Sequence, residues 1–129
     1  MKEINLTTKI RVYLIDECSD ADKKLIELAK EATKKAYAPY SEFAVGAALL
    51  LSNGKIIIGN NRENAAYPSG LCAERTAVFY ANSQFPEQKI EAIAIAAFYN
   101  GDFTPDLISP CGSCRQVLLE VESRYKSDV

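Results

Sequence analysis

Apolar and polar residues alternate near the N-terminus. From Ile4 to Leu14 the even positions are apolar, with Thr8 as the one interruption. An alternation of period two is typical of a β-strand with one buried face. The pattern predicts an N-terminal strand extension within residues 1–18.

The following segment has the spacing of an amphipathic helix. Ser19, with Asp22 three residues later, resembles a helix-capping signal. Apolar residues then recur at helical spacing, at Leu25, Leu28, Ala29, Ala32 and Ala36. Since proline disrupts a helix interior, this first helix is predicted to end before Pro39.

Two apolar runs, 43–51 and 55–58, flank the dipeptide Asn53-Gly54. Asn-Gly between such runs is a strong signal for a β-hairpin. The second strand is expected to break at Gly59-Asn60-Asn61, where a long loop begins that runs past Gly70. Long loops in compact domains usually carry function.

The second half of the chain predicts two more helices and a central strand. One helix is expected from Cys72, and another after Pro110. Between them, residues 90–98 are continuously apolar, as in a strand covered by helices on both faces. The pattern indicates an α/β fold with a mixed β-sheet flanked by helices.

Length and charge narrow the class of protein. A chain of 129 residues suits a single domain, 1–129, with a real core. With 15 Lys and Arg against 17 Asp and Glu, the net charge is -2, and no basic stripe suggests a nucleic-acid partner. No segment is apolar enough to cross a membrane, so a cytoplasmic protein is expected. The absence of histidine excludes catalytic triads and dyads that contain it.

Three of the four cysteines have the spacing of a zinc site. Cys72 opens one predicted helix, and Cys111 and Cys114 stand three apart at the start of another, on one helix face. Unpaired N–H groups and the helix dipole favour thiolates at such positions. Three protein ligands leave the fourth zinc position open for water, as in a catalytic site. Cys18 stands apart and is not expected to be a ligand.

Cys72-Ala73-Glu74-Arg75 followed by Pro110-Cys111-Gly112-Ser113-Cys114 resembles the zinc-dependent cytidine deaminase family, in its small three-cysteine homotetrameric form. The segments 38–48 and 61–65 resemble further motifs of that family, in the same order. The resemblance spans about residues 36–120. It implies a cytidine deaminase-like three-layer α/β/α fold, with a catalytic core at 19–125. The N-terminal strand and the end at Val129 depart from the family pattern, so the fold is expected to be C-terminally shortened.

The resemblance implies hydrolytic deamination of free cytidine or deoxycytidine by a zinc-bound hydroxide, with uridine or deoxyuridine and ammonia as products of pyrimidine salvage. Glu74 is the expected catalytic acid and base. Substrate-binding residues would be Phe43, Asn61, Glu63 and Ala73, and supporting residues would be Arg75, Asn64, Tyr67 and Arg115. One Zn²⁺ per subunit and a homotetramer, or a dimer, are expected.

Arg75 also has an electrostatic reason for its position. Three thiolates on Zn²⁺ leave a net charge of -1, which opposes ionisation of a bound water. Arg75 lies three residues after Cys72, so its guanidinium can reach that sulfur. Arg115 is a second candidate for the same role.

Each of these residues also has an ordinary structural explanation. Glu74 could complement a helix dipole, Phe43 could be a core residue, and Asn61 and Glu63 could be solvated loop residues. A structural zinc site with Cys18 and a redox cysteine pair are alternatives for the cysteines. Two other functions stay open: a blasticidin-type deaminase of a related aminopyrimidine nucleoside, and a non-catalytic, zinc-stabilised interaction module.

Overall fold

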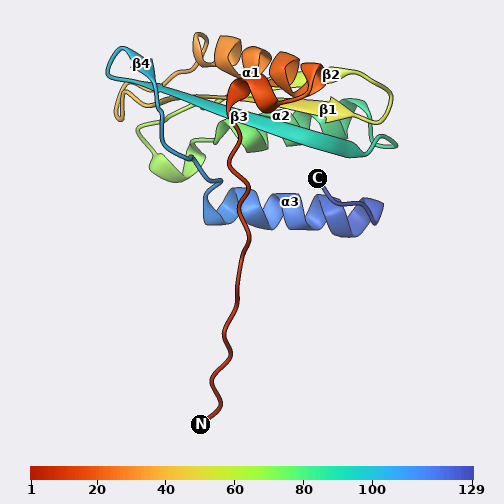
Figure 1. The fold of residues 1–129 in the computed structure, drawn as a ribbon. Helices are drawn as coiled ribbons and strands as arrows, with labels where there is room; N and C mark the ends of the chain where they lie inside the picture. Colours follow the sequence, from red (N-terminus) through yellow and green to blue (C-terminus); the bar gives the residue numbers. More distant parts are fainter.

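Three helices lie on the two faces of one four-stranded sheet in the computed structural model, which describes residues 1–129 (Figure 1). Helix α1 (Asp20–Thr33) covers one face. Helices α2 (Ala73–Gln84) and α3 (Gly112–Tyr125) lie on the opposite side. This arrangement confirms the predicted α/β class with helical layers around a sheet.

The sheet has the strand order β2-β1-β3-β4. Its strands are β1 (Ala44–Leu51), β2 (Ile56–Asn60), β3 (Ile90–Tyr99) and β4 (Asp102–Phe103). All neighbouring strands pair antiparallel, so the expectation of a mixed sheet is wrong for these strands. Short turns join β1 to β2 and β3 to β4, and such turns can link only antiparallel neighbours.

Both tight turns of the sheet contain Asn-Gly. The predicted hairpin at Asn53-Gly54 is confirmed, with Leu50 opposite Ile56. A second turn at Asn100 and Gly101, where the sequence indicated only a loop, connects β3 to β4. Both residues have positive φ, 54° and 87°, as a two-residue hairpin turn of type I′ requires.

The two faces of β1 pack against different helices. Ala47, Leu49 and Leu51 belong to the larger core cluster, which includes residues of α2 and α3. Ala48 faces the other way, into a cluster with Leu25 and Ala29 of α1. Alternate residues of a strand point to opposite faces, so one continuous apolar run serves both helical layers.

A glycine in β2 allows α2 to approach the sheet closely. A Cβ atom at Gly59 would lie 2.6 Å from the backbone oxygen of Ala73 and 2.6 Å from the backbone nitrogen of Ala77. Real Cβ atoms do not approach backbone atoms so closely. Gly59 therefore fixes where the first turn of α2 lies, and with it the residues at the start of that helix.

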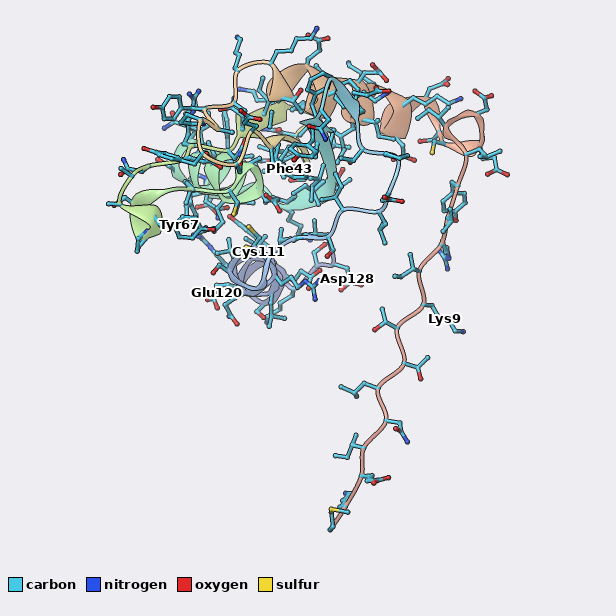
Figure 2. The ribbon with its side chains drawn as sticks, turned by 90° about the vertical axis from the view of Figure 1, so that its left-hand side faces the viewer. Lys9, Phe43, Tyr67, Cys111, Glu120 and Asp128 are labelled. Carbon is cyan, nitrogen blue, oxygen red and sulfur yellow. The ribbon has the colours of Figure 1, made fainter.

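The predicted N-terminal strand does not form. Residues 1–14 have no regular secondary structure and extend away from the sheet, and a single turn of 3₁₀-helix, η1 (Ile15–Glu17), precedes α1 (Figures 1 and 2). Leu6 and Val12 are 91% and 89% exposed. Alternation produces a strand only where another strand supplies hydrogen bonds, and no strand of this chain pairs with the segment.

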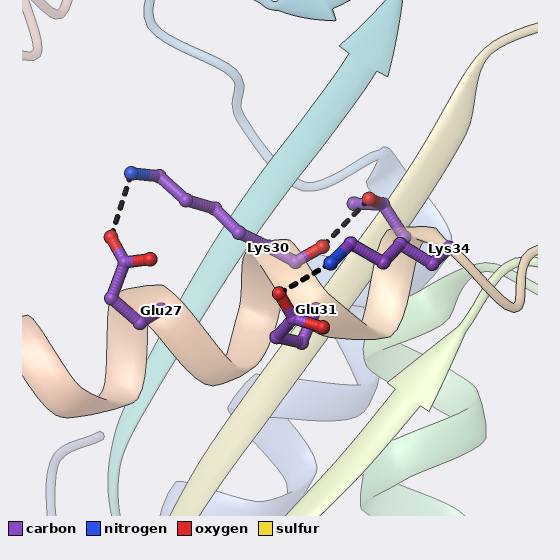
Figure 3. Close-up of polar contacts among 5 residues, drawn as sticks. Glu27, Lys30, Glu31 and Lys34 are labelled. Carbon is purple, nitrogen blue, oxygen red and sulfur yellow. Dashed lines mark hydrogen bonds and ion pairs between the residues drawn. The ribbon is translucent and has the colours of Figure 1, made fainter.

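Helix α1 begins as its sequence predicts. Ser19 is the N-cap, and its hydroxyl oxygen accepts a hydrogen bond from the backbone N–H of Asp22 at 3.1 Å. The outer surface carries two ion pairs, Lys30 with Glu27 and Lys34 with Glu31 (Figure 3). Such exposed pairs contribute little stability. No helix of the structure combines the length and hydrophobicity that crossing a bilayer requires.

Candidate functional site

Three cysteine sulfurs meet where two helices begin. Cys72 is the N-cap residue of α2 and Cys111 is the N-cap residue of α3, while Cys114 lies in the first turn of α3. The Sγ atoms of Cys72 and Cys111 are 3.7 Å apart, and those of Cys111 and Cys114 are 3.5 Å apart. All three sulfurs lie within 4.8 Å of one another. Residues 39 positions apart are thus brought into one cluster.

This spacing fits a tetrahedral zinc ion. Zn–S bonds of about 2.3 Å at tetrahedral angles separate the sulfurs by about 3.8 Å. Cys114 is fully buried, Cys72 is half-buried and Cys111 is exposed, so the cluster is open on one side. Cys18 lies outside the cluster, and its thiol donates to the backbone oxygen of Leu14. A four-cysteine site that includes Cys18 is therefore wrong for this fold.

Arg75 lies against the sulfurs, as its spacing from Cys72 predicts. Its Nη2 donates to the Sγ of Cys72 at 3.5 Å. The hydrogen bond to Cys72 raises the pKa of the Arg75 guanidinium, with further contributions from Cys114. Its Nε is buried without a hydrogen-bond partner. A half-buried cation at this position offsets negative charge on the sulfurs.

The two cysteines of α3 have different environments. The backbone N–H of Cys114 donates to the Sγ of Cys111 at 3.4 Å, and this bond lowers the pKa of the Cys111 thiol. Burial raises the pKa of the Cys114 thiol, and the negative charge of Glu74 raises it further. The surroundings of the two thiols therefore shift their pKa values in opposite directions.

Glu74 is the acidic residue beside this cluster. It lies in the first turn of α2, two residues after Cys72, and is 6% exposed. It forms neither of the two ion pairs of the structure, which both lie on α1. Because Cys72 is the N-cap of the same helix, Glu74 lies next to the cluster at the start of α2. A buried carboxylate without a paired cation is suited to proton transfer.

A cleft of about 860 Å³ opens next to the cysteines. Among the predicted residues, its lining includes Phe43, Asn61, Glu63, Asn64, Tyr67, Cys72 and Arg75. Figure 2 shows Phe43, Tyr67 and Cys111 gathered at this end of the molecule. A smaller cavity of about 260 Å³ lies between α1 and the segment after β4, away from the cysteines.

Asn61 and Glu63 hold the loop that leads into β1. The side chain of Asn61 accepts from the backbone N–H of Val45 and donates to the backbone oxygen of Phe43, both at 2.8 Å. The carboxylate of Glu63 accepts from the hydroxyl of Ser41 and from the backbone N–H of Tyr40. Sequence reasoning assigned no separate role to Ser41, although it lies within the motif that carried the resemblance.

The remaining predicted residues lie around the site in different ways. Tyr67, in the 3₁₀-helix η2 (Tyr67–Ser69), is 89% exposed. The Oδ1 of Asn64 accepts from the backbone N–H of Ala66 at 2.8 Å and so braces the loop. Ala73 is fully buried, and its role in substrate binding stays a prediction.

Arg115 does not contact the sulfurs. Its Nε donates to the backbone oxygen of Pro110 at 2.9 Å, and its Nη2 donates to the hydroxyl of Ser109 at 3.1 Å. An effect of Arg115 on the charge of the sulfurs therefore stays a prediction. Its guanidinium instead supports the loop that delivers Cys111 to the start of α3.

Comparison with known proteins agrees with this site. Residues 19–126 match the family model of the cytidine and deoxycytidylate deaminase zinc-binding region. The cytidine deaminase of Sporosarcina psychrophila is 48% identical over 98 residues, which cover 76% of this chain and 68% of the relative. A probable cytidine deaminase of Dictyostelium discoideum is 42% identical over 98 residues, covering 76% and 63%. The chain spans 63% to 69% of the length of the curated relatives that it matches.

The solved structures that this chain resembles are also cytidine deaminases. The cytidine deaminase of Burkholderia pseudomallei superimposes with a TM-score of 0.66 at 48% identity, covering 74% of this chain and 72% of that structure. The cytidine deaminase of Mycobacterium tuberculosis gives a TM-score of 0.67 at 40% identity, covering 80% and 78%. The three-cysteine cluster lies inside the matched region. The chain therefore belongs to the zinc-binding family of cytidine and deoxycytidylate deaminases, and its three clustered cysteines could hold a metal ion.

Proposed function

We propose that this chain catalyses the hydrolytic deamination of free cytidine and 2′-deoxycytidine, with uridine or 2′-deoxyuridine and ammonia as products, and that it serves pyrimidine salvage. The observation that carries the proposal is the buried carboxylate of Glu74 beside three clustered cysteines, next to a cleft of about 860 Å³. The family match and the names of the relatives support the same reaction.

Cys72, Cys111 and Cys114 would hold the zinc ion. Bound zinc lowers the pKa of a water molecule that it binds, which makes that water a better nucleophile at neutral pH. Three thiolates carry one more negative charge than Zn²⁺ neutralises. The guanidinium of Arg75, hydrogen-bonded to Cys72, would offset part of this negative charge and so would favour loss of a proton from a zinc-bound water.

Glu74 would move the protons of the reaction. Its carboxylate accepts a proton from the attacking water and passes it to N3 of the pyrimidine ring. The water oxygen would add to C4, and the carboxylate would then move the second proton of the water from the C4 hydroxyl to the amino group. The C4–N bond then breaks, ammonia leaves and a carbonyl remains at C4. Burial of Glu74 removes competing water, which suits one carboxylate to all three transfers.

Phe43, Asn61 and Glu63 would bind the nucleoside. The half-buried ring of Phe43 lines the cleft and can pack against the pyrimidine. Glu63 carries a carboxylate that can accept a hydrogen bond from a sugar hydroxyl. The chain carries 15 Lys and Arg against 17 Asp and Glu, with no basic stripe of the kind that binds phosphate groups, which favours a free nucleoside over a nucleotide.

We also propose a homotetramer with its catalytic core at residues 19–125. The aromatic side chains of Tyr67, Phe79 and Tyr80 are 89%, 46% and 56% exposed, and aromatic residues are enriched where subunits meet. Light scattering coupled to size-exclusion chromatography measures the mass of the assembly. A monomer at micromolar concentration would contradict this part of the proposal.

A substrate panel tests the proposed reaction. The zinc-loaded chain is incubated with cytidine, 2′-deoxycytidine, cytidine 5′-monophosphate and blasticidin S, and deamination is followed by ultraviolet absorbance. We expect turnover of the two free nucleosides and at least about tenfold lower kcat/KM for the nucleotide, because the chain has no basic stripe to bind a phosphate group. Preference for blasticidin S would indicate the related antibiotic-inactivating activity. Bound zinc without turnover of any compound would indicate a non-catalytic module.

A further inference from the structure

The hydroxyl of Ser41 lies between the backbone of Phe43 and the carboxylate of Glu63. Its Oγ accepts a hydrogen bond from the backbone N–H of Phe43 at 3.1 Å and donates one to Oε1 of Glu63. A hydroxyl has a single hydrogen. Because the N–H of Phe43 already points at the oxygen, that hydrogen is directed to Glu63, and the direction of the bond is fixed by the backbone.

Most of the acceptor capacity of Glu63 is used by the same short loop. Its Oε2 accepts from the backbone N–H groups of Tyr40 at 2.8 Å and of Ser41 at 3.2 Å. A carboxylate offers about four acceptor positions, so these three bonds leave about one for a ligand. The carboxylate is exposed in the cleft that Phe43 also lines. The loop therefore determines which position of the carboxylate is available there.

Phe43 has a second support that does not involve Ser41. The side chain of Asn61 bonds both the backbone oxygen of Phe43 and the backbone N–H of Val45. These two bonds hold the entry to β1 in place if the hydroxyl of Ser41 is removed. Glu63, in contrast, has no other side-chain donor, and would lose the one bond that fixes its Oε1.

We propose that Ser41 is a positioning residue for sugar recognition: its hydroxyl orients the carboxylate of Glu63 so that the remaining acceptor position meets a secondary hydroxyl of the bound nucleoside. This inference rests on the proposed nucleoside substrate. It assigns Ser41 an action on the sugar that is separate from the packing of Phe43 against the base.

A purely structural role of Ser41 predicts a different result. Between Ser41 and Phe43, Glu42 has a positive φ of 56°, so the loop contains a strained residue that Ser41 could simply stabilise. Loss of loop order would displace Phe43, and the affinity for every substrate would fall to the same extent. If Ser41 instead acts through Glu63, its loss lowers the affinity only for substrates that carry the secondary sugar hydroxyls.

The test compares Ser41→Ala with the wild type on cytidine and on 2′,3′-dideoxycytidine. For cytidine we expect kcat/KM to fall about tenfold, chiefly through KM, because a hydrogen bond to a charged group loses its geometry. For the dideoxynucleoside we expect a change of less than about twofold, because no hydroxyl meets Glu63. Ser41→Thr keeps a hydroxyl and should restore most of the activity on cytidine. Equal losses on both substrates would overturn the proposal.

Ser52→Ala is the matched control. Ser52 also accepts from a backbone N–H, that of Lys89 at 3.1 Å, and donates to a side-chain oxygen, that of Gln88 at 3.0 Å. It lies in the turn after β1, outside the cleft. We expect this variant to have wild-type kinetics on both nucleosides. Loss of a serine hydroxyl elsewhere in the chain then does not explain a selective loss of cytidine turnover in Ser41→Ala.

A titration tests the orientation of Glu63 without turnover. The hydrogen bond from Ser41, followed by those of two backbone N–H groups, lowers the pKa of the Glu63 carboxyl. Its stabilising effect on the loop is therefore present above the ordinary pKa of glutamate and is lost as pH falls through the lowered pKa. Carbon NMR of the carboxyl should show a higher pKa in Ser41→Ala. An unchanged pKa would overturn the proposal.

Equilibrium binding separates this inference from the proposed reaction. A wild-type chain that turns over neither nucleoside contradicts the proposed function. The comparison is then made with uridine and 2′,3′-dideoxyuridine by calorimetry. Ser41→Ala should weaken binding of uridine about tenfold and leave the dideoxy compound within about twofold. Equal affinities of the variant and the wild type for uridine would refute the role of Ser41.

Discussion

Replacement of Gly59 by alanine should displace the start of α2 and weaken zinc binding. The new Cβ would lie 2.6 Å from two backbone atoms, the oxygen of Ala73 and the nitrogen of Ala77. Ordinary van der Waals contact begins at 3.4 Å, so relief of the clash requires a shift of about 0.8 Å by one element. Backbone atoms cannot rotate away as a side chain does. The helix must therefore move relative to β2.

The size of this shift sets the expected losses of stability and zinc affinity in Gly59→Ala. Overpacking of a well-packed core costs about 1–3 kcal/mol of the free energy of unfolding. Cys72 is the N-cap of the displaced helix, and metal sites tolerate ligand displacements of only about 0.2 Å. We therefore expect zinc affinity to fall at least about tenfold. Denaturant unfolding measures the stability, and competition with a chromophoric chelator measures the affinity.

Gly112→Ala is the control for this experiment. Gly112 lies between Cys111 and Cys114, and a Cβ there would meet no atom within 4 Å. It is the first residue of α3, where alanine is favoured over glycine by up to about 1 kcal/mol. Wild-type zinc affinity is expected in this variant. Wild-type stability and affinity in Gly59→Ala would refute the reasoning that this glycine sets the position of α2.

Two further predictions concern the metal and the N-terminal segment. Chelation of zinc should lower the melting temperature, because metal binding to the folded cluster contributes stability that is lost with the metal; an unchanged melting temperature by calorimetry would speak against bound zinc. Trypsin should cleave after Lys9 and Arg11, which are exposed and outside any helix or strand, and the product should melt within about 1 °C of the intact chain. A fall of several degrees would show that this segment packs against the fold.

Local signals in the sequence predicted most elements of the fold. The Ser19 cap, the Asn53-Gly54 turn and the continuous apolar run of β3 each depend on residues close together in the chain. The same kind of signal was available at Asn100-Gly101, where positive φ at both residues forms the second hairpin. Its strand β4 has only two residues, too few for an alternating pattern to indicate it.

Pairing between distant segments could not be predicted from local patterns. Residues 4–14 alternate as a strand does, but alternation does not specify a partner, and here none is present. The spacing of the cysteines, in contrast, is a local signal that indicates a metal site from the sequence alone. The hydrogen bonds of Ser41 and Glu63, 22 residues apart, depend on how the loop before β1 meets the segment after β2. The position of the Arg115 guanidinium likewise depends on an acceptor in the preceding loop, the backbone oxygen of Pro110.

The central claim is that Glu74 transfers protons at a zinc site formed by the three cysteines. The most direct test is cytidine turnover by Glu74→Gln, with its zinc content measured on the same sample. We expect zinc at one equivalent per chain, wild-type stability, and kcat reduced by at least about 10²-fold, because glutamine cannot accept or deliver the proton. Near-native turnover by a zinc-loaded Glu74→Gln variant would contradict the account.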